Sequence, residues 1–163
     1  MIEIIKMDNN LMDREDAVNS FKKAMIAYFI TFNKKGEMHS RPMTNFNDNP
    51  YGVIWFPSYN NTRKVGDIKQ NKRTLILYPA IEEGKFYEIE GKAELGTRSE
   101  VEEKWVWWYL YWHPEMNDYF WFDQTGKHPE RAIINVHPEN IKKLDKSDVK
   151  LIKDTYATLV PIK

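Results

Sequence analysis

Five short runs of β-branched, aromatic and other apolar residues, separated by turn residues, precede residue 96 and constrain the fold most. The first run, 25–32, reads MIAYFITF, and the next four residues, NKKG at 33–36, place glycine where a tight turn takes a positive φ. The remaining runs lie at 37–46, 51–56, 74–78 and 86–95. Short strands joined by short turns favour an antiparallel sheet or barrel over a doubly wound α/β fold.

Helices are predicted before, between and after these strands. A capped amphipathic helix is expected at 13–24, where Asp13 and Asp16 suit the positive end of the helix dipole. A short helix is expected at 63–71, and Ser99 is expected to cap a third helix that carries most of the tryptophans.

The C-terminal part of the chain predicts one more strand and a tail. The strand is expected at 131–136, continued by 141–144 beyond a His-Pro-Glu break at 137–139. The tail, 149–162, is expected to be an edge strand or a clasp.

The 163 residues suffice for one domain with a sizeable core, so we expect a single domain, 1–163. Within it we expect an N-terminal helix at about 13–24, a barrel core at about 25–145 and a C-terminal strand or clasp at 146–163.

Composition and missing motifs narrow the classes of function. Lysine plus arginine (24) balances aspartate plus glutamate (24), so we expect no nucleic-acid partner. The absence of cysteine excludes disulfides, thiolate metal sites and cysteine nucleophiles. No apolar stretch of signal-peptide or membrane-spanning length occurs, so we expect a cytoplasmic protein without membrane contact. The histidines lack metal-ligand spacing, and dinucleotide, P-loop and hydrolase motifs are missing, so no metal site and no catalytic residue is assigned.

An anion site is indicated at the start of the predicted helix 63–71. Arg63 and Lys64 lie in its first turn, where each positive charge opposes the helix dipole by about 0.3–1 kcal/mol. Backbone N–H groups together with these two cations would form a phosphate cradle. The alternative is a solvated basic pair ahead of an amphipathic helix.

Two further patterns each have a functional and a structural interpretation. Pro42 interrupts the predicted strand 37–46, which indicates either a gap facing a ligand or an ordinary edge strand. Trp105, Trp108 and Trp112 lie at helical spacing on one face of the third helix, where they would either floor a planar cofactor or fill a dimer core. Because this helix is apolar on most of its circumference, we expect a partner subunit to cover it.

Taken in order, these segments resemble the pyridoxamine 5′-phosphate oxidase-like flavoproteins, specifically the general stress protein 26-type branch. The matching pieces span about 25–145 and are AYFITFNKKGEMHSRPM, VIWFPS, TRKVGDIKQNKRTLILY, EIEGKAEL, the tryptophan-rich helix ending WHPEM, and AIINVHPENIKKLD. The resemblance implies a mainly β protein, an antiparallel split β-barrel with flanking α-helices. It also implies a homodimer that binds FMN at the subunit interface.

The resemblance assigns cofactor-binding roles by position. The residues implied to line the flavin ring, or to lie along the ring and ribityl chain, are Arg41, Pro42, Met43, Phe56, Pro57 and Ser58. The phosphate would be held by Arg63 and Lys64. From their aromatic character alone, and not from a family motif, we expect Trp105, Trp108 and Trp112 of the second subunit to close the site.

Two departures from the family pattern bear on the reaction. The oxidases place a glutamine that touches the flavin near the strand ending in GKAE, where this chain has Phe86. They also end in a segment with arginine and histidine that grips pyridoxal phosphate, whereas this chain ends in DTYATLVPIK. Oxidation of vitamin B6 is therefore not expected.

Three functions remain open at this stage. The first is an FMN-dependent oxidoreductase of unknown substrate, with NADH, NADPH or another small molecule as electron donor. The second is a non-catalytic module that stores flavin, or holds heme or a deazaflavin, in a stress response. The third is a structural dimer without a cofactor, in which Arg63 and Lys64 are merely solvated.

Overall fold

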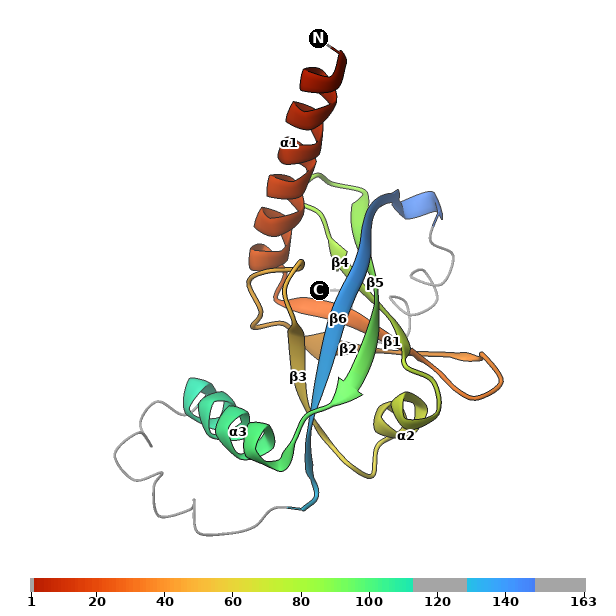
Figure 1. The fold of residues 1–163 in the computed structure, drawn as a ribbon, viewed down its shortest axis with the longest axis vertical. Coiled ribbons are helices and arrows are strands. Elements are labelled where there is room, and N and C mark those ends of the chain that lie inside the picture. Colours follow the sequence, from red (N-terminus) through yellow and green to blue (C-terminus); the bar gives the residue numbers. More distant parts are fainter. Residues whose placement is uncertain (1, 113–128, 149–163) are drawn as a thin grey trace.

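The computed structural model describes residues 2–112 and 129–148 of the chain (Figure 1). Its elements, in chain order, are α1 (Ile2–Lys23), β1 (Ile26–Phe32), β2 (Met38–Thr44), β3 (Ile54–Tyr59), α2 (Arg63–Gln70), β4 (Arg73–Pro79), β5 (Lys85–Leu95), α3 (Arg98–Trp112), β6 (Arg131–Asp145) and the short 3₁₀ helix η3 (Lys146–Asp148). The tail predicted as an edge strand or clasp, 149–162, lies outside the described residues.

The described strands form one antiparallel sheet in the order β2-β1-β4-β5-β6-β3. The predicted antiparallel arrangement is therefore confirmed. The sheet curls strongly, because Phe29 of β1 and Phe56 of β3 pack with ring centroids 5.3 Å apart although three strands separate β1 from β3. In the described part of the chain β2 and β3 each have a strand partner on one side only.

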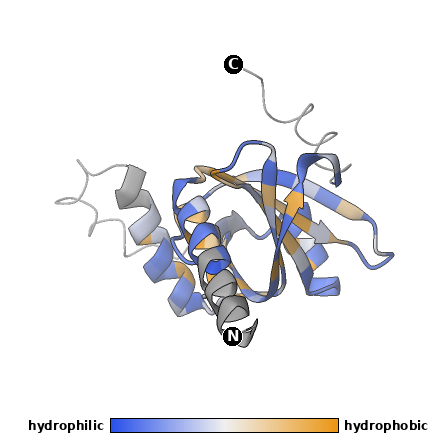
Figure 2. Ribbon diagram, turned by 90° about the horizontal axis from the view of Figure 1, so that it is seen from above, coloured by the Kyte–Doolittle hydropathy of each residue, from blue (hydrophilic) through white to orange (hydrophobic). Residues whose placement is uncertain are grey.

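The apolar run of β1 is buried on both faces of the sheet, since six of its seven residues are buried. Alternate side chains enter two clusters, as Figure 2 suggests by the alternation of hydrophobic and hydrophilic positions along the strands. The inner cluster fills the barrel and comprises Ala17, Phe21, Ala24, Ala27, Phe29, Ile54, Phe56, Val65, Ile68, Ile76, Tyr78, Tyr87, Ile89, Ala93, Ala132, Ile134 and Val136. The outer cluster comprises Tyr28, Ile30, Phe32, Leu75 and Leu77.

Two helices close opposite ends of the barrel: in Figure 1 α1 stands above it and α2 lies below it. Both contribute side chains to the inner cluster, Phe21 from α1 and Val65 and Ile68 from α2. Among the helices of the described residues, none combines the length and the apolar character that a membrane-spanning helix needs.

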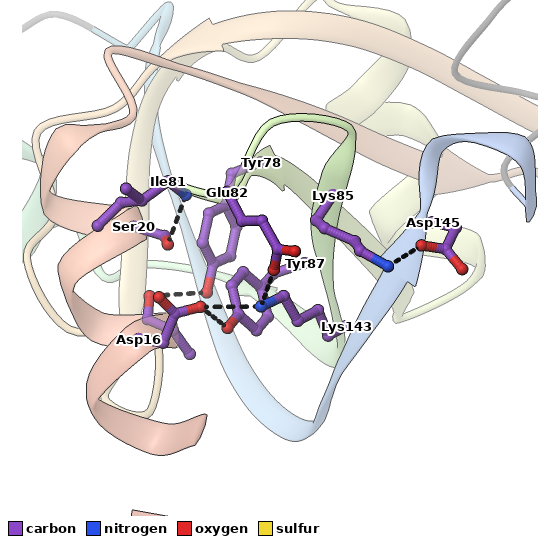
Figure 3. A network of polar contacts seen from close by, with 10 residues as sticks. Asp16, Ser20, Tyr78, Ile81, Glu82, Lys85, Tyr87, Lys143 and Asp145 are labelled. Atoms are coloured by element: carbon purple, nitrogen blue, oxygen red, sulfur yellow. Dashed lines mark hydrogen bonds and ion pairs between the residues drawn. The ribbon is translucent and has the colours of Figure 1, made fainter. Parts of the chain in front are cut away.

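A polar network on the sheet holds the C-terminal half of α1 in place (Figure 3). Asp16 accepts hydrogen bonds from the Tyr87 hydroxyl and from Lys143, while Tyr78 donates to the Ala17 carbonyl over 3.1 Å. The Ser20 hydroxyl accepts from a backbone N–H after β4 at 3.0 Å. The helix begins well before the predicted residue 13, so its N-terminal bound was wrong.

One other predicted boundary was wrong for a local reason. The cap of α3 is Thr97, not Ser99, because the Thr97 hydroxyl accepts the Glu100 N–H at 3.2 Å. The expected continuation of the last strand beyond 137–139 is confirmed, since β6 runs on to Asp145. A bulge opposite Gly91 absorbs the irregularity, and a Cβ at Gly91 would lie 2.6 Å from the His137 carbonyl oxygen.

Replacing Phe21 with alanine should lower the free energy of unfolding by about 3–5 kcal/mol, because the ring is fully buried and packs 4.8 Å from Tyr78. Urea denaturation followed by circular dichroism measures this change. Lys22→Ala, at the next and exposed position, is the control and should change it by less than about 0.5 kcal/mol. Equal effects of the two variants would show that α1 does not complete the core.

Candidate functional site

The candidate site is the opening between the two edge strands, β2 and β3. The Asn45 N–H donates to the Met25 carbonyl at 2.9 Å, so in β2 the odd-numbered residues pair with β1 and Pro42 faces the free edge. The N–H and C=O of Trp55 bond to the side chain of Asn47 and not to β6, so Pro57, two residues on, also faces the free edge of β3. Neither proline therefore costs a ladder hydrogen bond. The edge-strand interpretation of Pro42 is confirmed, and β3 continues through Pro57 to Tyr59 instead of ending at the predicted residue 56.

The side chain of Asn47 closes one end of this opening by hydrogen-bonding the main chain of Trp55, as a neighbouring strand would. Its amide donates to the Trp55 carbonyl at 2.9 Å, and its side-chain oxygen accepts the Trp55 N–H at 3.1 Å. Asn45 holds the loop, since its amide donates to the carbonyls of Phe21 and Ala24 at 3.0 and 3.1 Å. The opening thus extends away from this loop, toward the start of α2. Sequence reasoning assigned both asparagines only to a strand end and a turn.

Three cations from two elements lie together where the opening meets α2. Arg41 on β2 lies close enough to Arg63 and Lys64 on α2 for their charges to interact. Burial lowers the pKa of the Arg41 guanidinium, the charge of Asp67 raises it, and the charge of Arg63 lowers it. Burial, followed by the charge of Arg41, likewise lowers the pKa of the Lys64 ammonium. The positive charges are therefore held against a free-energy cost that an anion would reduce.

The N-terminus of α2 is arranged to receive such an anion. Thr62 occupies the N-cap position, but its hydroxyl donates to the Tyr59 carbonyl at 2.8 Å and makes no hydrogen bond to the first turn. Ser58, predicted as a cofactor contact, lies 3.2 Å from the Thr62 hydroxyl. The first turn contains no acidic residue. The positive end of the helix dipole therefore adds to the side-chain charges.

A buried carboxylate lies behind the cations. Asp67 is the only buried charged side chain in the described part of the chain. It accepts a hydrogen bond from the Thr31 hydroxyl at 2.7 Å and pairs with His39 Nδ1 at 2.8 Å. Burial raises the pKa of the Asp67 carboxyl. The hydrogen bonds from His39 and Thr31, together with the charges of His39 and Arg41, lower it by more, so the net pKa is below its ordinary value. Sequence reasoning gave Asp67 no role, because nothing in the spacing of the sequence brings 31, 39 and 67 together.

The other predicted site residues on β2 and β3, Met43 and Phe56, differ in how deeply they are buried. Met43 is half-buried and packs against the inner cluster. Phe56 is fully buried against Phe29, so the structure does not bring it to the surface of the opening. Phe86, at the expected glutamine position, packs against the outer cluster as an apolar residue opposite Leu144.

The side chains of Trp105 and Trp108 pack near β6 in their own chain. Trp105 is buried, donates to the Ala132 carbonyl at 3.0 Å and lies 5.1 Å from the partly buried Trp108. Whether these rings also fill a dimer core stays a prediction. Their expected role in closing a second subunit's site stays a prediction. The side chain of Trp112 lies outside the described residues.

A shallow aromatic pocket lies between α3 and the loop after β2. It measures about 240 Å³ and is lined by Phe46, Trp55, Glu103, Lys104 and Trp107. The three rings lie within 6 Å of one another, and the Lys104 ammonium lies 5.2 Å from the Trp55 ring. Trp107 remains 47% exposed, which leaves an apolar surface on this side of the molecule.

Among the described residues no group of His, Asp and Glu side chains could hold a metal ion.

A family model described as "Pyridoxamine 5'-phosphate oxidase like" matches residues 13–155. No curated protein matches the chain significantly. The predicted family resemblance is thus confirmed by a match over most of the chain.

Several solved structures share the fold at low sequence identity. A Listeria innocua protein provisionally named pyridoxamine 5′-phosphate oxidase has a TM-score of 0.60 and 21% identity, covering 80% of this chain and 97% of that one. General stress protein 26 from Bacillus anthracis has a TM-score of 0.57 and 17% identity, covering 80% and 92%. A protein named F420 reductase has a TM-score of 0.51 and 16% identity, covering 76% and 94%. The predicted mainly β split barrel with flanking helices is confirmed.

The Asp67→Asn variant should lose a pH-dependent part of the stability. Because the pKa of Asp67 is lower in the folded protein than in the unfolded chain, its ionised form stabilises the fold above pH about 4, and this contribution is lost as the pH falls through the folded pKa. We therefore expect wild type to exceed the variant by about 1 kcal/mol near neutral pH, with the gap shrinking on acidification. Urea denaturation at a series of pH values measures it.

Asp148→Asn, at an exposed carboxylate of η3, is the matched control. Its unfolding free energy should follow that of the wild type across the pH series. A gap between wild type and Asp67→Asn that does not change with pH would contradict the assignment of an ionised, hydrogen-bonded Asp67.

Proposed function

Because the chain belongs to the pyridoxamine 5′-phosphate oxidase-like family, we propose that it binds FMN at the opening between β2 and β3, with the phosphate at the start of α2. The observation that carries this proposal is the convergence of Arg41, Arg63 and Lys64 on an N-terminal helix end that has no side-chain cap. Charge, dipole and N–H donors all favour the same kind of ligand at one place.

The chemistry of these donors fits a phosphate monoester. Such a group carries about 1.5–2 negative charges at neutral pH and several acceptor oxygens. Arg41 and Arg63 can each offer paired N–H donors, and Lys64 offers a point charge. With Asp67 nearby, the three cations and one carboxylate leave a formal excess of two positive charges, which matches the charge of the phosphate.

The two free strand edges suit the polar rim of a flavin ring. Pro42 and Pro57 interrupt the row of N–H donors on these edges, so neither edge is a complete template for another strand. On binding, ring nitrogens and oxygens would hydrogen-bond main-chain groups along these edges. Met43 supplies an apolar contact beside them.

We further propose that the chain is an oxidoreductase. When bound, FMN would supply hydride and electron transfer, while the chain's own residues bind and orient it. Pyridoxamine phosphate is not the proposed substrate, because the chain ends in DTYATLVPIK and not in a segment with arginine and histidine. We assign no described side chain the role of general acid or general base.

Binding of a cofactor without turnover is the second candidate function, and the name of one structural neighbour, F420 reductase, makes F420 a second ligand to test. The two functions differ in one observable. Reduction of the bound cofactor by NADH or NADPH, followed by reoxidation by an acceptor, supports the oxidoreductase, whereas bound cofactor inert to both supports storage.

Replacing Arg63 and Lys64 together with alanine should weaken FMN binding by about 100-fold, because two charge-assisted contacts to the phosphate are lost. Flavin absorbance and fluorescence titration of the apoprotein measure the change. The double variant Lys69→Ala/Lys72→Ala removes two exposed positive charges nearby and is the control, with little change expected.

A colourless wild type that does not take up FMN would overturn the flavin proposal. A Soret band in the purified protein would replace FMN with heme. Equal loss of affinity in both double variants would show that net charge, and not the start of α2, decides binding.

We also propose that the protein is a homodimer with the cofactor at the subunit interface. Support comes from large apolar side chains left exposed in the described chain, including Val53, Tyr59 and Trp107. The rings of Tyr59 and Trp107 lie where α3 packs on β3. Sedimentation at micromolar concentration should therefore give twice the mass of the 163-residue chain. The double variant Tyr59→Ser/Trp107→Ser should shift the protein toward monomer, and a wild type that sediments as a monomer would contradict the proposal.

A further inference from the structure

We propose that Thr31 and Asp67 form a buried relay that positions Arg41 for the phosphate of the cofactor, a role that rests on the proposed function. Thr31 lies on β1, Asp67 on α2 and Arg41 on β2. None of the sequence patterns brings these three residues together. The relay assigns a positioning role to two residues that do not themselves contact the ligand.

The direction of the hydrogen bonds is fixed by the chemistry of the groups. Arg41 Nη1 can only donate, and it donates to the Thr31 hydroxyl oxygen at 2.9 Å. The single hydroxyl proton of Thr31 is then directed to the Asp67 carboxylate, 2.7 Å away. The ionised Asp67 can only accept, which makes Arg41 to Thr31 to Asp67 a chain with one orientation.

The relay also fixes the position of Arg41 relative to the other two cations, Arg63 and Lys64. Arg63 and Lys64 move with α2, whereas Arg41 moves with β2. Asp67 lies one turn after Arg63 on the same helix, so its bond to Thr31 ties the start of α2 to the β1–β2 hairpin. His39, also on β2, holds the same carboxylate oxygen at 2.8 Å and strengthens this connection.

A carboxylate at this place needs a reason, because its charge alone repels a phosphate. Asp67 is nevertheless buried, and its charge interacts with that of Arg41. Long-range electrostatics therefore predicts that removal of Asp67 tightens anion binding. The relay predicts the reverse, because Thr31 would lose the acceptor that keeps its hydroxyl oxygen turned toward Arg41. The Phe29 carbonyl, which accepts from the same Nη1 at 3.2 Å, would then be the remaining oriented partner of Arg41.

Thr31 provides a test without any change of charge. Thr31→Val keeps the shape of the side chain and removes the hydroxyl, whereas Thr31→Ser keeps the hydroxyl. The matched control is Thr74→Val, because Thr74 pairs with Thr31 on β4 and is equally buried. Its hydroxyl donates to the Gly91 carbonyl and not to a carboxylate.

FMN and riboflavin are the two probes, because they differ only in the phosphate. Thr31→Val should bind FMN about tenfold more weakly than wild type, with riboflavin affinity unchanged. Thr31→Ser and Thr74→Val should bind both flavins as wild type does. Equal weakening of FMN and riboflavin would show a general structural defect and overturn the relay.

The Asp67 variants decide between positioning and charge. Asp67→Ala should also weaken FMN about tenfold, and Asp67→Asn, whose side-chain oxygen can still accept from Thr31, should restore most of the affinity. Tighter FMN binding by Asp67→Ala would show that the charge of Asp67 matters more than its hydrogen bonds, and would overturn the relay.

A measurement on the apoprotein separates failure of this inference from failure of the proposed function. The guanidinium signals of Arg41 in ¹⁵N NMR, assigned by their loss in Arg41→Lys, should exchange with water at least about tenfold faster in Thr31→Val than in wild type or Thr31→Ser. Unchanged exchange overturns the relay whatever the protein binds. Faster exchange in a protein that binds neither flavin supports the relay and overturns only the FMN proposal.

Discussion

A curled sheet that does not close leaves β2 and β3 with a strand partner on one side only in the described part of the chain, and the rest of this structure depends on where those two edges lie. Both edges, β2 and β3, border one opening. Pro42 and Pro57 each remove a donor on the free side, and Asn47 satisfies Trp55 with its side chain. These three positions therefore hinder further strand pairing along the two edges.

The position of α2 turns this opening into a charged site. Val65 and Ile68 anchor the helix in the inner cluster, which holds its N-terminus at the end of β3. Packing of this apolar face thus brings Arg63 and Lys64 to Arg41, a cation on a different element. The fold tolerates three neighbouring cations because apolar burial and the Asp67 network stabilise the elements that carry them.

The third helix carries tryptophans on two faces that have different surroundings. Trp105 packs within its own chain, where its ring also lies 5.3 Å from Tyr59 and its N–H reaches a carbonyl of β6. Trp107 lies on another face of the same helix and stays largely exposed. Aromatic spacing therefore located the apolar helix correctly, but the side of the helix that the sheet covers depends on how α3 packs on β3 and β6.

The sequence by itself determined the strands, the antiparallel class, the turn at Gly36 and the basic start of α2, because alternation, turn chemistry and capping are local properties. It misplaced the start of α1, the end of β3 and the cap of α3. Pairing with β6 carries β3 on to Tyr59, and the Thr97 hydroxyl accepts an N–H from the first turn of α3. The sequence held no sign of the relay through Thr31 and Asp67 or of the Asn47 bonds to Trp55. Asn47 and Trp55 lie on either side of one loop, whereas Thr31, Asp67 and Arg41 lie on three elements that only folding brings together. The tertiary structure alone therefore decided how Arg41 is presented.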